Sequence, residues 1–561
     1  MKYSGAEIII KLLERQGIRQ IAGIPGGANL PMYDALSRSR DIRHILARHE
    51  QGAGFIAQGQ ARVTGKPAVF FATSGPGATN AISAVADAKL DSIPIICITG
   101  QVAQTLIGTD AFQEIDTFGL SIPITKHSHM ARSAKELLEI IPDAFRIAMS
   151  GRPGPVWIDV PKDVQMELIE FNSWPEIGTA DETPVFRHEQ IEEAAKMINA
   201  AKRPIVYIGG GAIHSEASKQ VRLLIERLNA PAVMTLMGLG AFPVRHELSL
   251  GMLGMHAARF TNHALEECDC LIALGARFDD RATGKVAQFC PDANIVHIDI
   301  DPCELNKLKN ANVGITADLG EALDQLVPHI EISSPNAWND RIEQLKREYP
   351  MEMPYIDDPL SGYGIISYVA RMLEGETFIT TDVGQHQMRV AQAFPFEKPR
   401  QLLTSGGLGT MGFGFPAAIG AALEKRDATV ACFSGDGSLL MNIQELITAV
   451  EQDVNVKIIL CNNNSLGLVH QQQDLFYKKR IFASKYHQSV DFAAIARGFK
   501  MEAHDLGNCM DPSVTLAEAL AKPGPVLINV PIDVQQHVFP MVPPGGANKE
   551  MLTHMKSKGE E

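Results

Sequence analysis

Long apolar runs are missing from this 561-residue sequence, and so is a leader-like segment at its start. No stretch approaches the ~20 consecutive apolar residues that a membrane-spanning helix needs. The first residues, MKYSGAEIIIKLLERQGI, instead predict an amphipathic helix that Ser4 caps, with no signal or transit peptide before it. We therefore expect a soluble, cytoplasmic protein that does not bind membranes.

Cysteine is also scarce. The eight cysteines are scattered, and no CxxC pair is followed by a second pair, which argues against a structural zinc site. Cys97 and Cys461 lie in apolar, strand-like runs and are expected to be buried thiols. This usage fits a reducing compartment.

Positive charge is the minority sign, with 51 Lys and Arg against 65 Asp and Glu and a formal net charge of -14. This balance argues against a nucleic-acid surface. It does not exclude an anionic substrate, because a buried site has its own local field. The length is too great for one core and predicts two to four domains.

One pattern occurs three times: a β-branched run, a glycine-rich turn and a helical segment. It begins near KPAVFFATSGPG (from Lys66), RPIVYIGGGAI (from Arg203) and FITTDVGQHQ (from Phe378). Alternating helices and apolar strands predict parallel sheets covered on both faces. The first and third segments end alike, in GPVWIDVPKDV and GPVLINVPIDV, so we expect an α/β fold of three doubly wound domains in which a duplicated pair flanks a different one.

Polar connectors near Met166–Arg187 and Ile332–Asp358 suggest where these domains end. The predicted domains are residues 1–165, a pyrimidine-binding domain; 188–330, a central FAD-binding-like domain; and 360–540, a diphosphate-binding and Mg²⁺-binding domain. Residues 541–561 are predicted to form a C-terminal tail. The names of the domains follow from the motifs below.

The most informative chemical motif begins at Gly435. The run ATVACFS predicts a strand that ends at Gly-Asp-Gly, Ser438 is expected to cap one helix running to Gln452, and VKIILC predicts the next strand, which ends before three asparagines. Such a crossover brings both strand ends to one sheet edge, so Asp436 and Asn463 are expected to lie close together. Carboxylate and amide oxygens suit Mg²⁺, and a helix N-terminus with flanking glycines suits a diphosphate. Taken separately, both sequences are also common turns.

This motif resembles that of the thiamine-diphosphate enzymes, in which GDGS, a helix and a strand ending in NN hold the Mg²⁺ that bridges the cofactor's diphosphate. The resemblance implies side-chain ligation of Mg²⁺ by Asp436 and Asn463 and a carbonyl ligand from Ser465. It also implies cofactor contacts by Gln385, His386, Met411, Gly435, Gly437 and Ser438. Met411 resembles the side chain that holds thiamine in its bent conformer, although periodicity alone would assign it to the core.

A second part of the site is implied in the first domain. The string RHEQGA resembles the family's stretch carrying the glutamate that shares a proton with N1′ of the aminopyrimidine, which points to Glu50, with Asn80 as a further cofactor contact. The alternative is a helix-start glutamate that interacts with the helix dipole. Because Glu50 and Asp436 lie in different domains, the family's arrangement implies an active site between two subunits.

The resemblance covers nearly the whole chain and narrows to the acetohydroxyacid synthase (acetolactate synthase) family of catalytic large subunits. The strings that carry it are GIPGGA, RHEQGA, TSGPGATN, GTDAFQE, TKH, SGRPGPVWIDVPKDVQ, LGMH, RFDDR, HIDID, VGQHQM and GGLGTMGFG. It implies that Gly27 faces the thiazolium and that Phe112, Gln113 and Lys162 lie on the substrate side. Lys162 could steer the carboxylate of a 2-oxo acid, or it could be a solvated surface lysine.

The central domain resembles the FAD site of the biosynthetic members of this family. Its GGG turn alone is a weak dinucleotide signal, because it lacks the full spaced fingerprint, and a plain turn is the alternative. Without the resemblance, His256 would be an ordinary partly buried histidine. The implied FAD contacts are Arg152, Gly209, Gly210, Gly211, Met255, His256, Arg277, Asp279, Arg281, Asp299 and Asp318.

Two positions depart from the family's pattern, since Arg389 and Gln472 stand where most relatives carry tryptophan. In the family the second of these tryptophans packs on the incoming second oxo acid and favours an ethyl over a methyl group. One methylene against such a wall is worth roughly 1–3 kcal/mol of discrimination. We therefore expect only a weak preference for 2-oxobutanoate.

The resemblance implies an enzyme that uses thiamine diphosphate, Mg²⁺ and FAD in branched-chain amino-acid biosynthesis. It would decarboxylate pyruvate and ligate the hydroxyethyl unit to a second 2-oxo acid, either pyruvate or, less preferred, 2-oxobutanoate. A homodimer or tetramer and a small regulatory subunit are implied as partners. A flavin-dependent pyruvate oxidase of the same fold and a non-catalytic subunit are the alternatives.

Overall fold

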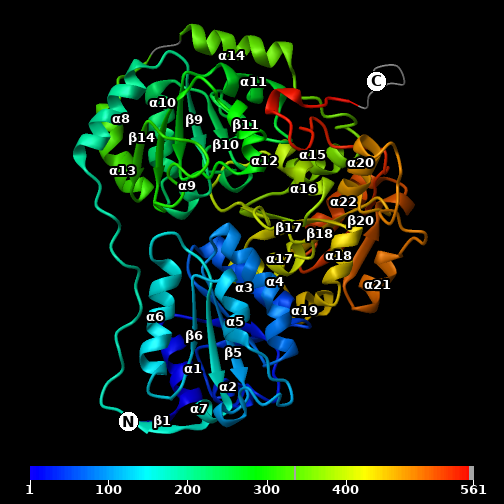
Figure 1. Cartoon of the computed structure of the whole chain (residues 1–561). Coiled ribbons are helices and arrows are strands. Elements are labelled where there is room, and N and C mark those ends of the chain that lie inside the picture. Colours follow the sequence, from blue (N-terminus) through cyan, green and yellow to red (C-terminus); the bar gives the residue numbers. More distant parts are fainter. Residues whose placement is uncertain (334–335, 555–561) are drawn as a thin grey trace.

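The computed structural model describes residues 1–333 and 336–554, and within them three six-stranded parallel sheets form three domains (Figure 1). A small antiparallel pair, β1 (Lys2–Ser4) with β8 (Leu168–Glu170), joins the two ends of the first domain. The predicted α/β class and the number of domains are confirmed.

The first and third domains share one topology. The first contains β2 (Gln20–Gly23), β3 (Arg43–Leu46), β4 (Ala68–Ala72), β5 (Ile95–Gln101), β6 (His127–Met130) and β7 (Val156–Pro161), in the order β3-β2-β4-β5-β7-β6. The third contains β15 (Thr377–Thr381), β16 (Leu402–Leu403), β17 (Thr429–Gly435), β18 (Val456–Asn462), β19 (Glu502–Asp505) and β20 (Val526–Pro531), in the order β16-β15-β17-β18-β20-β19. The two orders are the same when each domain's strands are numbered along the chain, which confirms the predicted duplication.

The central domain differs from both. Its strands are β9 (Pro204–Ile208), β10 (Ala232–Met234), β11 (Ser249–Met252), β12 (Cys270–Leu274), β13 (Asn294–Asp299) and β14 (Val313–Thr316), in the order β11-β10-β9-β12-β13-β14. This is the strand order of dinucleotide-binding folds, in which ligands bind beyond the carboxyl ends of the strands where the order reverses. Here that point lies between β9 and β12.

The helices cover the faces of the three sheets (Figure 1). The first domain has α1 (Gly5–Arg15), α2 (Leu30–Ser37), α3 (Glu50–Thr64), α4 (Pro76–Asp91), α5 (Thr117–Ser121), α6 (Leu137–Met149) and α7 (Lys162–Met166). The central domain has α8 (His188–Ala200), α9 (Gly211–His214), α10 (Ser218–Leu228), α11 (Arg259–Glu267), α12 (Asp280–Thr283), α13 (Leu319–Leu326) and α14 (Ala337–Glu348). The third has α15 (Gly362–Met372), α16 (Gln385–Ala393), α17 (Gly414–Glu424), α18 (Asp436–Met441), α19 (Glu445–Gln452), α20 (Gly467–Phe476), α21 (Phe492–Gly498) and α22 (Pro512–Ala521).

Of the predicted helix starts, one is confirmed and one is wrong. Ser4 caps α1 through a reciprocal capping box with Glu7, as expected. The single helix expected from Ser438 to Gln452 is wrong, because Asn442 ends α18 and a separate helix, α19, begins at Glu445. Ser438 is not the cap either: it lies inside α18 and donates its hydroxyl to the Val383 carbonyl at 3.1 Å.

Two segments predicted to be connecting or terminal are packed. The second polar connector contains α14, whose Trp338, Ile342 and Leu345 are buried in a core cluster of the central domain. Residues 541–554 of the predicted tail also return to that domain: the Val542 N–H donates to the Met255 carbonyl at 2.9 Å, and the side chain of buried Asn548 donates to the Ala282 carbonyl. Residues 555–561 of that tail lie outside the described residues. A short segment with few apolar residues gives no local sign that it packs against a distant part of the chain.

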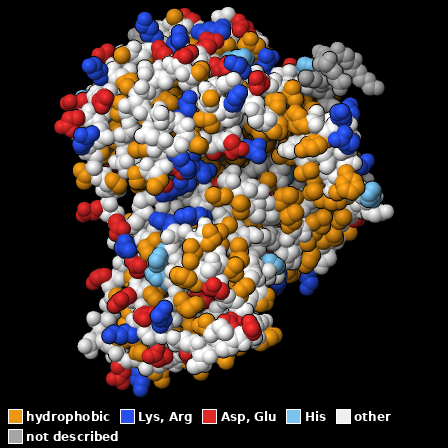
Figure 2. All heavy atoms as spheres, in the orientation of Figure 1, with side chains coloured by type: hydrophobic (Ala, Val, Ile, Leu, Met, Phe, Trp, Pro, Cys, Tyr) orange, Lys and Arg blue, Asp and Glu red, His pale blue; other side chains and the backbone are white. Residues whose placement is uncertain are grey.

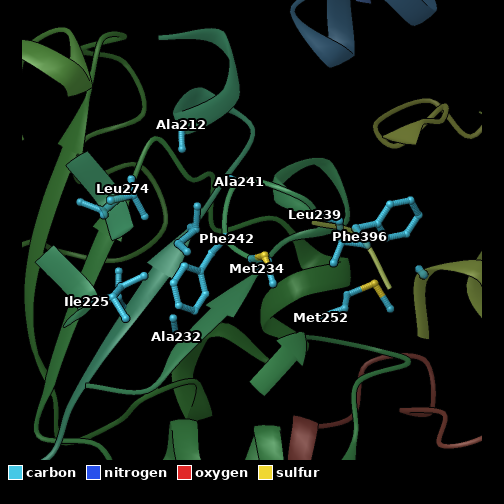
Figure 3. Packing of buried hydrophobic residues seen from close by; sticks show 14 of the residues in the cluster. Ala212, Ile225, Ala232, Met234, Leu239, Ala241, Phe242, Met252, Leu274 and Phe396 are labelled. Carbon is cyan, nitrogen blue, oxygen red and sulfur yellow. The ribbon is translucent and has the colours of Figure 1, made fainter. Parts of the chain in front are cut away.

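The central core joins the third domain without a polar boundary. Figure 3 shows Phe242, Met234 and Leu274 among the buried side chains of the central sheet, with Phe396 of the third domain beside Leu239. The Phe396 carbonyl also accepts from the Val244 N–H at 2.9 Å. These contacts fix the orientation of the central domain over the carboxyl edge of the third.

The first and third domains meet through α3 and α17, which occupy equivalent places in the duplicated folds (Figure 1). A Cβ on Gly59 of α3 would lie 2.1 Å from the Ala417 carbonyl oxygen, and a Cβ on Gly420 of α17 would lie 2.0 Å from that of Ile56. The two contacts mirror each other. Glycine is required because each helix backbone lies directly against the other.

Cys97 and Cys461 are buried, as predicted, whereas Cys303 is exposed. In the part of the chain that the structure describes, no helix is both long and apolar enough to cross a membrane.

Replacing Gly420 by alanine is expected to lower the free energy of unfolding by about 1–3 kcal/mol, because the added methyl group must push two helix backbones apart. Urea or thermal denaturation of the purified protein measures this loss. Gly498→Ala is the matched control, since a Cβ on this helical glycine would have no neighbour within 4 Å and the change favours the helix. Equal stability of the two variants would contradict the close packing.

Candidate active site

The carboxyl edge of the third sheet brings together the predicted metal ligands. Strands β17 and β18 pair in parallel with Gly435 opposite Cys461, so Asp436 and the asparagines leave the sheet side by side. The Asp436 carboxylate accepts the Gly437 N–H at 3.0 Å and the Ser465 N–H at 3.1 Å. Its burial raises its pKa to about 6, against the lowering effect of these backbone donors.

Asn463 belongs to a chain of amides behind this edge. Its Nδ2 donates to Gln385 Oε1 at 3.2 Å, and Gln385 donates in turn to Gln471 at 2.9 Å. Gln471 is fixed by the Val538 backbone, from which it accepts and to which it donates. Because Asn463 donates through its nitrogen, its side-chain oxygen is left to act as an acceptor or a metal ligand.

His386 lies against the same turn: a Cβ on Gly435 would be 3.0 Å from its Cε1 atom. Burial, and then the charge of Arg389, lower the pKa of His386 to about 3, so the ring is neutral. Its buried Nε2 has no hydrogen-bond partner among residues 1–333 and 336–554. An orphaned ring nitrogen beside Gly-Asp-Gly fits an additional ligand at this edge.

Gly437 lies under side chains of three other segments. A Cβ there would lie 2.6 Å from the hydroxyl oxygen of Tyr486 and 2.8 Å from Leu466. Met411 reaches the same turn, since its Cε lies 3.5 Å from that Cβ position. The predicted third-domain residues Gln385, His386, Met411, Gly435–Ser438, Asn463 and Ser465 therefore all follow the carboxyl ends of β15, β16, β17 and β18.

Glu50 lies in the equivalent place on the first sheet. It is the first residue of α3, as the alternative interpretation expected, yet it is only 8% exposed, and Asn80 donates to its Oε2 at 3.0 Å. The hydroxyls of Tyr33 and Thr73 nearby are buried and lack partners among the described residues. A buried carboxylate beside two orphaned hydroxyls fits a ligand with several polar atoms, such as an aminopyrimidine.

The substrate-side residues of the first domain are more open. Gly27 is exposed in the turn after β2, and Lys162 begins α7 just past β7 without a hydrogen bond to any described residue. Gln113 lies against the Gly75 turn, and Phe112 is 87% exposed.

Sequence reasoning missed Asp159, a carboxylate inside this edge that holds the segment carrying Phe112 and Gln113. It accepts the Thr99 hydroxyl at 2.7 Å and Gln101 Nε2 at 3.0 Å, and Gln101 also donates to the Ile115 carbonyl at 2.9 Å. Burial raises the pKa of Asp159 to about 7, opposed by these donors. It was missed because WIDVP gives only the pattern of a buried strand.

The central domain contributes a cavity of about 790 Å³ at the point where its strand order reverses. Its lining includes all eleven residues predicted for FAD: Arg152, Gly209, Gly210, Gly211, Met255, His256, Arg277, Asp279, Arg281, Asp299 and Asp318. All three domains contribute, through Ser92, Met237 and Gln472, for example. Neither Glu50 nor Asp436 lies on its wall.

The cavity combines a close-packed glycine turn with carboxylates at neighbouring strand ends. The Gly209 turn packs on the turn after β12 so tightly that a Cβ would lie 2.1 Å from the Gly275 carbonyl oxygen. No carboxylate follows β10, where the usual ribose-binding acid would stand, because Thr235 occupies that place. Asp299, the last residue of β13, and Asp318, which follows β14, offer carboxylates on the opposite side.

Several cavity residues already have partners. Arg152 pairs with Glu304 at 2.8 Å and Asp301 at 3.3 Å, so a ligand would have to share or replace these contacts. His256 is buried beside the Pro540 carbonyl at 2.9 Å, and burial lowers its pKa to about 4. Asp279 caps α12 by accepting from the N–H groups of Arg281 and Ala282.

Hydrogen bonds join the segments that carry Glu50 and Asp436 within one chain: the Arg48 and His49 N–H groups donate to Glu445 Oε1 at 2.9 and 3.1 Å, and Asn442 Nδ2 donates to Gln51 Oε1 at 3.2 Å. No hydrogen bond between described residues joins Glu50 itself to Asp436. Beside them lie exposed apolar side chains: Phe118 and Ile122 of the first domain, and Met441, Val469 and Phe482 of the third. Figure 2 shows hydrophobic side chains gathered over the regions of α3–α5 and of α18–α22.

Comparisons with known proteins agree with this division. Residues 3–120, 191–326 and 382–530 match the N-terminal TPP binding domain, the central domain and the C-terminal TPP binding domain of thiamine pyrophosphate enzymes. The chain is 58% identical over 551 residues to the acetolactate synthase isozyme 1 large subunit of Escherichia coli, covering 98% of each chain. It is 43% identical to the isozyme 2 large subunit of the same organism, covering 98% of this chain and 99% of that one. It is 42% identical to the chloroplastic acetolactate synthase 2 of Nicotiana tabacum, covering 98% and 85%.

Asp159→Asn is expected to change how stability depends on pH. Because the folded-state pKa of Asp159 is raised, its contribution is full below the unfolded pKa near 3.8 and is lost as the pH rises through about 7. Between pH 5 and 8 the wild type should lose about 2–3 kcal/mol from this group, and the variant should not. Urea unfolding of both proteins at both pH values isolates the difference, because other carboxylates contribute equally. Parallel pH dependences would contradict this assignment.

Proposed function

This chain belongs to the thiamine pyrophosphate enzymes as a large subunit of the acetolactate synthase type, and on that premise we propose that it decarboxylates one pyruvate and joins the two-carbon unit to a second 2-oxo acid. It is a transferase of branched-chain amino-acid biosynthesis. The observation that carries the proposal is the identity of 58% over nearly the full length of both chains. The relatives' names favour this function over a pyruvate oxidase or a non-catalytic subunit.

Thiamine diphosphate, when bound, supplies a carbon nucleophile and an electron sink for decarboxylation. Asp436, Asn463 and the Ser465 carbonyl would hold Mg²⁺, a hard ion that prefers such oxygen ligands. The diphosphate would meet the Gly435–Ser438 turn, Gln385 and His386. The buried Nε2 of His386, which has no partner among the described residues, supports a ligand at this turn.

Glu50 is the proposed proton-handling residue. Asn80 holds its Oε2, whereas its Oε1 accepts no hydrogen bond from any described residue and is free to hold or pass a proton. Burial excludes water that would otherwise compete for this proton. The unpartnered hydroxyls of Tyr33 and Thr73 would orient the ring that receives it.

The proposed active site is shared between two copies of the chain. No hydrogen bond between described residues joins Glu50 to Asp436 of the same chain, and exposed apolar side chains lie on both domains. Burying Phe112 and its neighbours against a second copy would dry the site and bring Gln113 and Lys162 towards the substrate. Lys162 would then pair with the substrate carboxylate. The relatives' designation as large subunits supports a small regulatory partner.

FAD is the proposed occupant of the central cavity. Its volume, the reversal of strand order and the carboxylates at the ends of β13 and β14 support a dinucleotide, with ribose hydroxyls near Asp299 and Asp318. The remaining end of the cavity reaches Val383, Leu408 and Gln472 of the third domain. The flavin ring would lie there, as a structural element between the domains.

Glu50→Gln should lower acetolactate formation from pyruvate by a factor of about 10² or more, because the amide cannot exchange a proton with the cofactor. Activity is measured with purified protein, thiamine diphosphate, Mg²⁺, FAD and pyruvate. Glu189→Gln is a matched control, since this exposed glutamate also lies in the first turn of a helix, α8. Full activity of Glu50→Gln would remove Glu50 from the mechanism.

Gln472 lines the cavity next to the third-domain edge, and we propose that it leaves the second-substrate pocket open. Competition between pyruvate and 2-oxobutanoate should therefore give mainly acetolactate in the wild type. Gln472→Trp adds an aromatic wall and should increase the preference for 2-oxobutanoate about 10-fold or more, in line with the value of one methylene group. Strong 2-oxobutanoate preference in the wild type would contradict the proposal.

A further inference from the structure

One loop of the third domain lies between the two proposed cofactor sites. Residues 404–413 connect β16 to α17 without a helix or strand of their own. Ser405, Gly406, Gly407, Leu408 and Gly409 line the central cavity, and Met411 follows them. A single loop thus forms a wall of the flavin cavity and carries the residue next to the Gly435–Ser438 turn.

Two carboxylates of another domain hold this loop. Asp87 and Asp91, both from α4 of the first domain, are buried. Asp91 accepts the Gly406 N–H at 3.1 Å and the Gly407 N–H at 2.7 Å. Asp87 accepts the Thr410 hydroxyl at 2.8 Å and also the Ser405 hydroxyl. The contacts cover the loop from its start to the residue before Met411.

The carboxylates themselves are fixed from α3. Arg62 pairs with Asp91 at 2.7 Å and lies 3.5 Å from Asp87, and Gln58 donates to Asp87 at 3.1 Å. The guanidinium also lies over the Phe413 ring, 4.9 Å from its centroid, at the end of the loop. One cation therefore serves two buried carboxylates, and the N–H and O–H donors of the loop supply the remaining stabilisation.

The far end of the loop is held differently. Asp382 of the third domain accepts the Gly412 N–H at 2.8 Å and the Gly414 N–H at 3.2 Å. The loop is thus attached at one end to its own domain and at the other to α4. The position of Met411 depends on both attachments.

We propose that Asp87 and Asp91 are positioning residues that set the flavin cavity wall and Met411 together through this loop, and so couple FAD binding to thiamine diphosphate binding. The proposal rests on the proposed function. A ligand that contacts the loop from one side favours the loop position that the other ligand also contacts, so each tightens the binding of the other.

The test measures binding rather than turnover. Flavin fluorescence gives the Kd of FAD for the apoprotein with and without saturating thiamine diphosphate and Mg²⁺, and protein fluorescence gives the Kd of thiamine diphosphate with and without FAD. In the wild type each cofactor should lower the Kd of the other by the same factor, about fivefold or more. A factor of one in the wild type overturns the proposal.

Asp91→Asn and Asp87→Asn should weaken both cofactors and reduce the coupling factor towards one. Thr410→Val keeps both carboxylates and removes one loop contact, so it should reduce coupling even if an aspartate variant fails to fold. Adding Thr410→Val to Asp87→Asn should change little further, because the two act through one contact. Unchanged coupling in folded Thr410→Val and Asp87→Asn proteins would sink the proposal.

Asp505→Asn is the matched control. Asp505 also accepts a loop N–H, from Gly507 at 3.0 Å, but lies away from the cavity, so its replacement should leave both affinities and the coupling unchanged. A similar loss in Asp505→Asn would mean that any aspartate change weakens binding, which also overturns the proposal. Failure of the proposed function is distinguishable, because a wild type that binds neither cofactor refutes that function, whereas uncoupled binding of both refutes only the positioning role.

Discussion

The backbone contact between α3 and α17 is the constraint on which the rest of the structure depends. Gly59 and Gly420 bring these helices together with no side chain between them, and the helices occupy matching places in two domains of the same topology. Glu50 begins α3, and the Met411 loop leads into α17. The contact between the two duplicated domains therefore fixes the position of Glu50 relative to the Met411 loop. Exposed apolar side chains such as Phe118 and Phe482 remain on the first and third domains, and the proposed second copy would cover them.

Much of this arrangement could be predicted from local patterns. The strand–turn–helix rhythm predicted three parallel-sheet domains, and the similar ends of the first and third segments predicted their common topology. Parallel strand ends meet at one edge by geometry, so the proximity of Asp436 to the asparagines was also predictable. The eleven residues expected around FAD line one cavity because they follow the strand ends of a single sheet or face it from the first domain. Each of these features depends on contacts within one domain or is implied by the family's motifs.

The parts that could not be predicted depend on contacts between distant segments. The break between α18 and α19 follows from Asn442, whose side chain donates to the Gly412 carbonyl. Residues 541–554 have few apolar side chains, so the sequence gives no local sign of their packing on the central domain. The environments of Asp87, Asp159 and Asp382 could not be predicted either. Burial raises the pKa values of these three carboxylates to about 6, 7 and 6. Hydroxyl and amide donors, rather than paired cations, surround most of these carboxylates, and no sequence pattern marks that environment.

Helix α4 contacts residues of both proposed parts of the active site, Glu50 and the Met411 loop. Near its start Asn80 holds Glu50, and at its end Asp87 and Asp91 hold the Met411 loop. In the proposed dimer, Glu50 serves a site completed by the partner, whereas the loop serves the other site. A shift of α4 along its axis would therefore be felt in both sites at once. Cooperativity between the two catalytic centres would then require no hinge or domain rotation, only the stiffness of one helix.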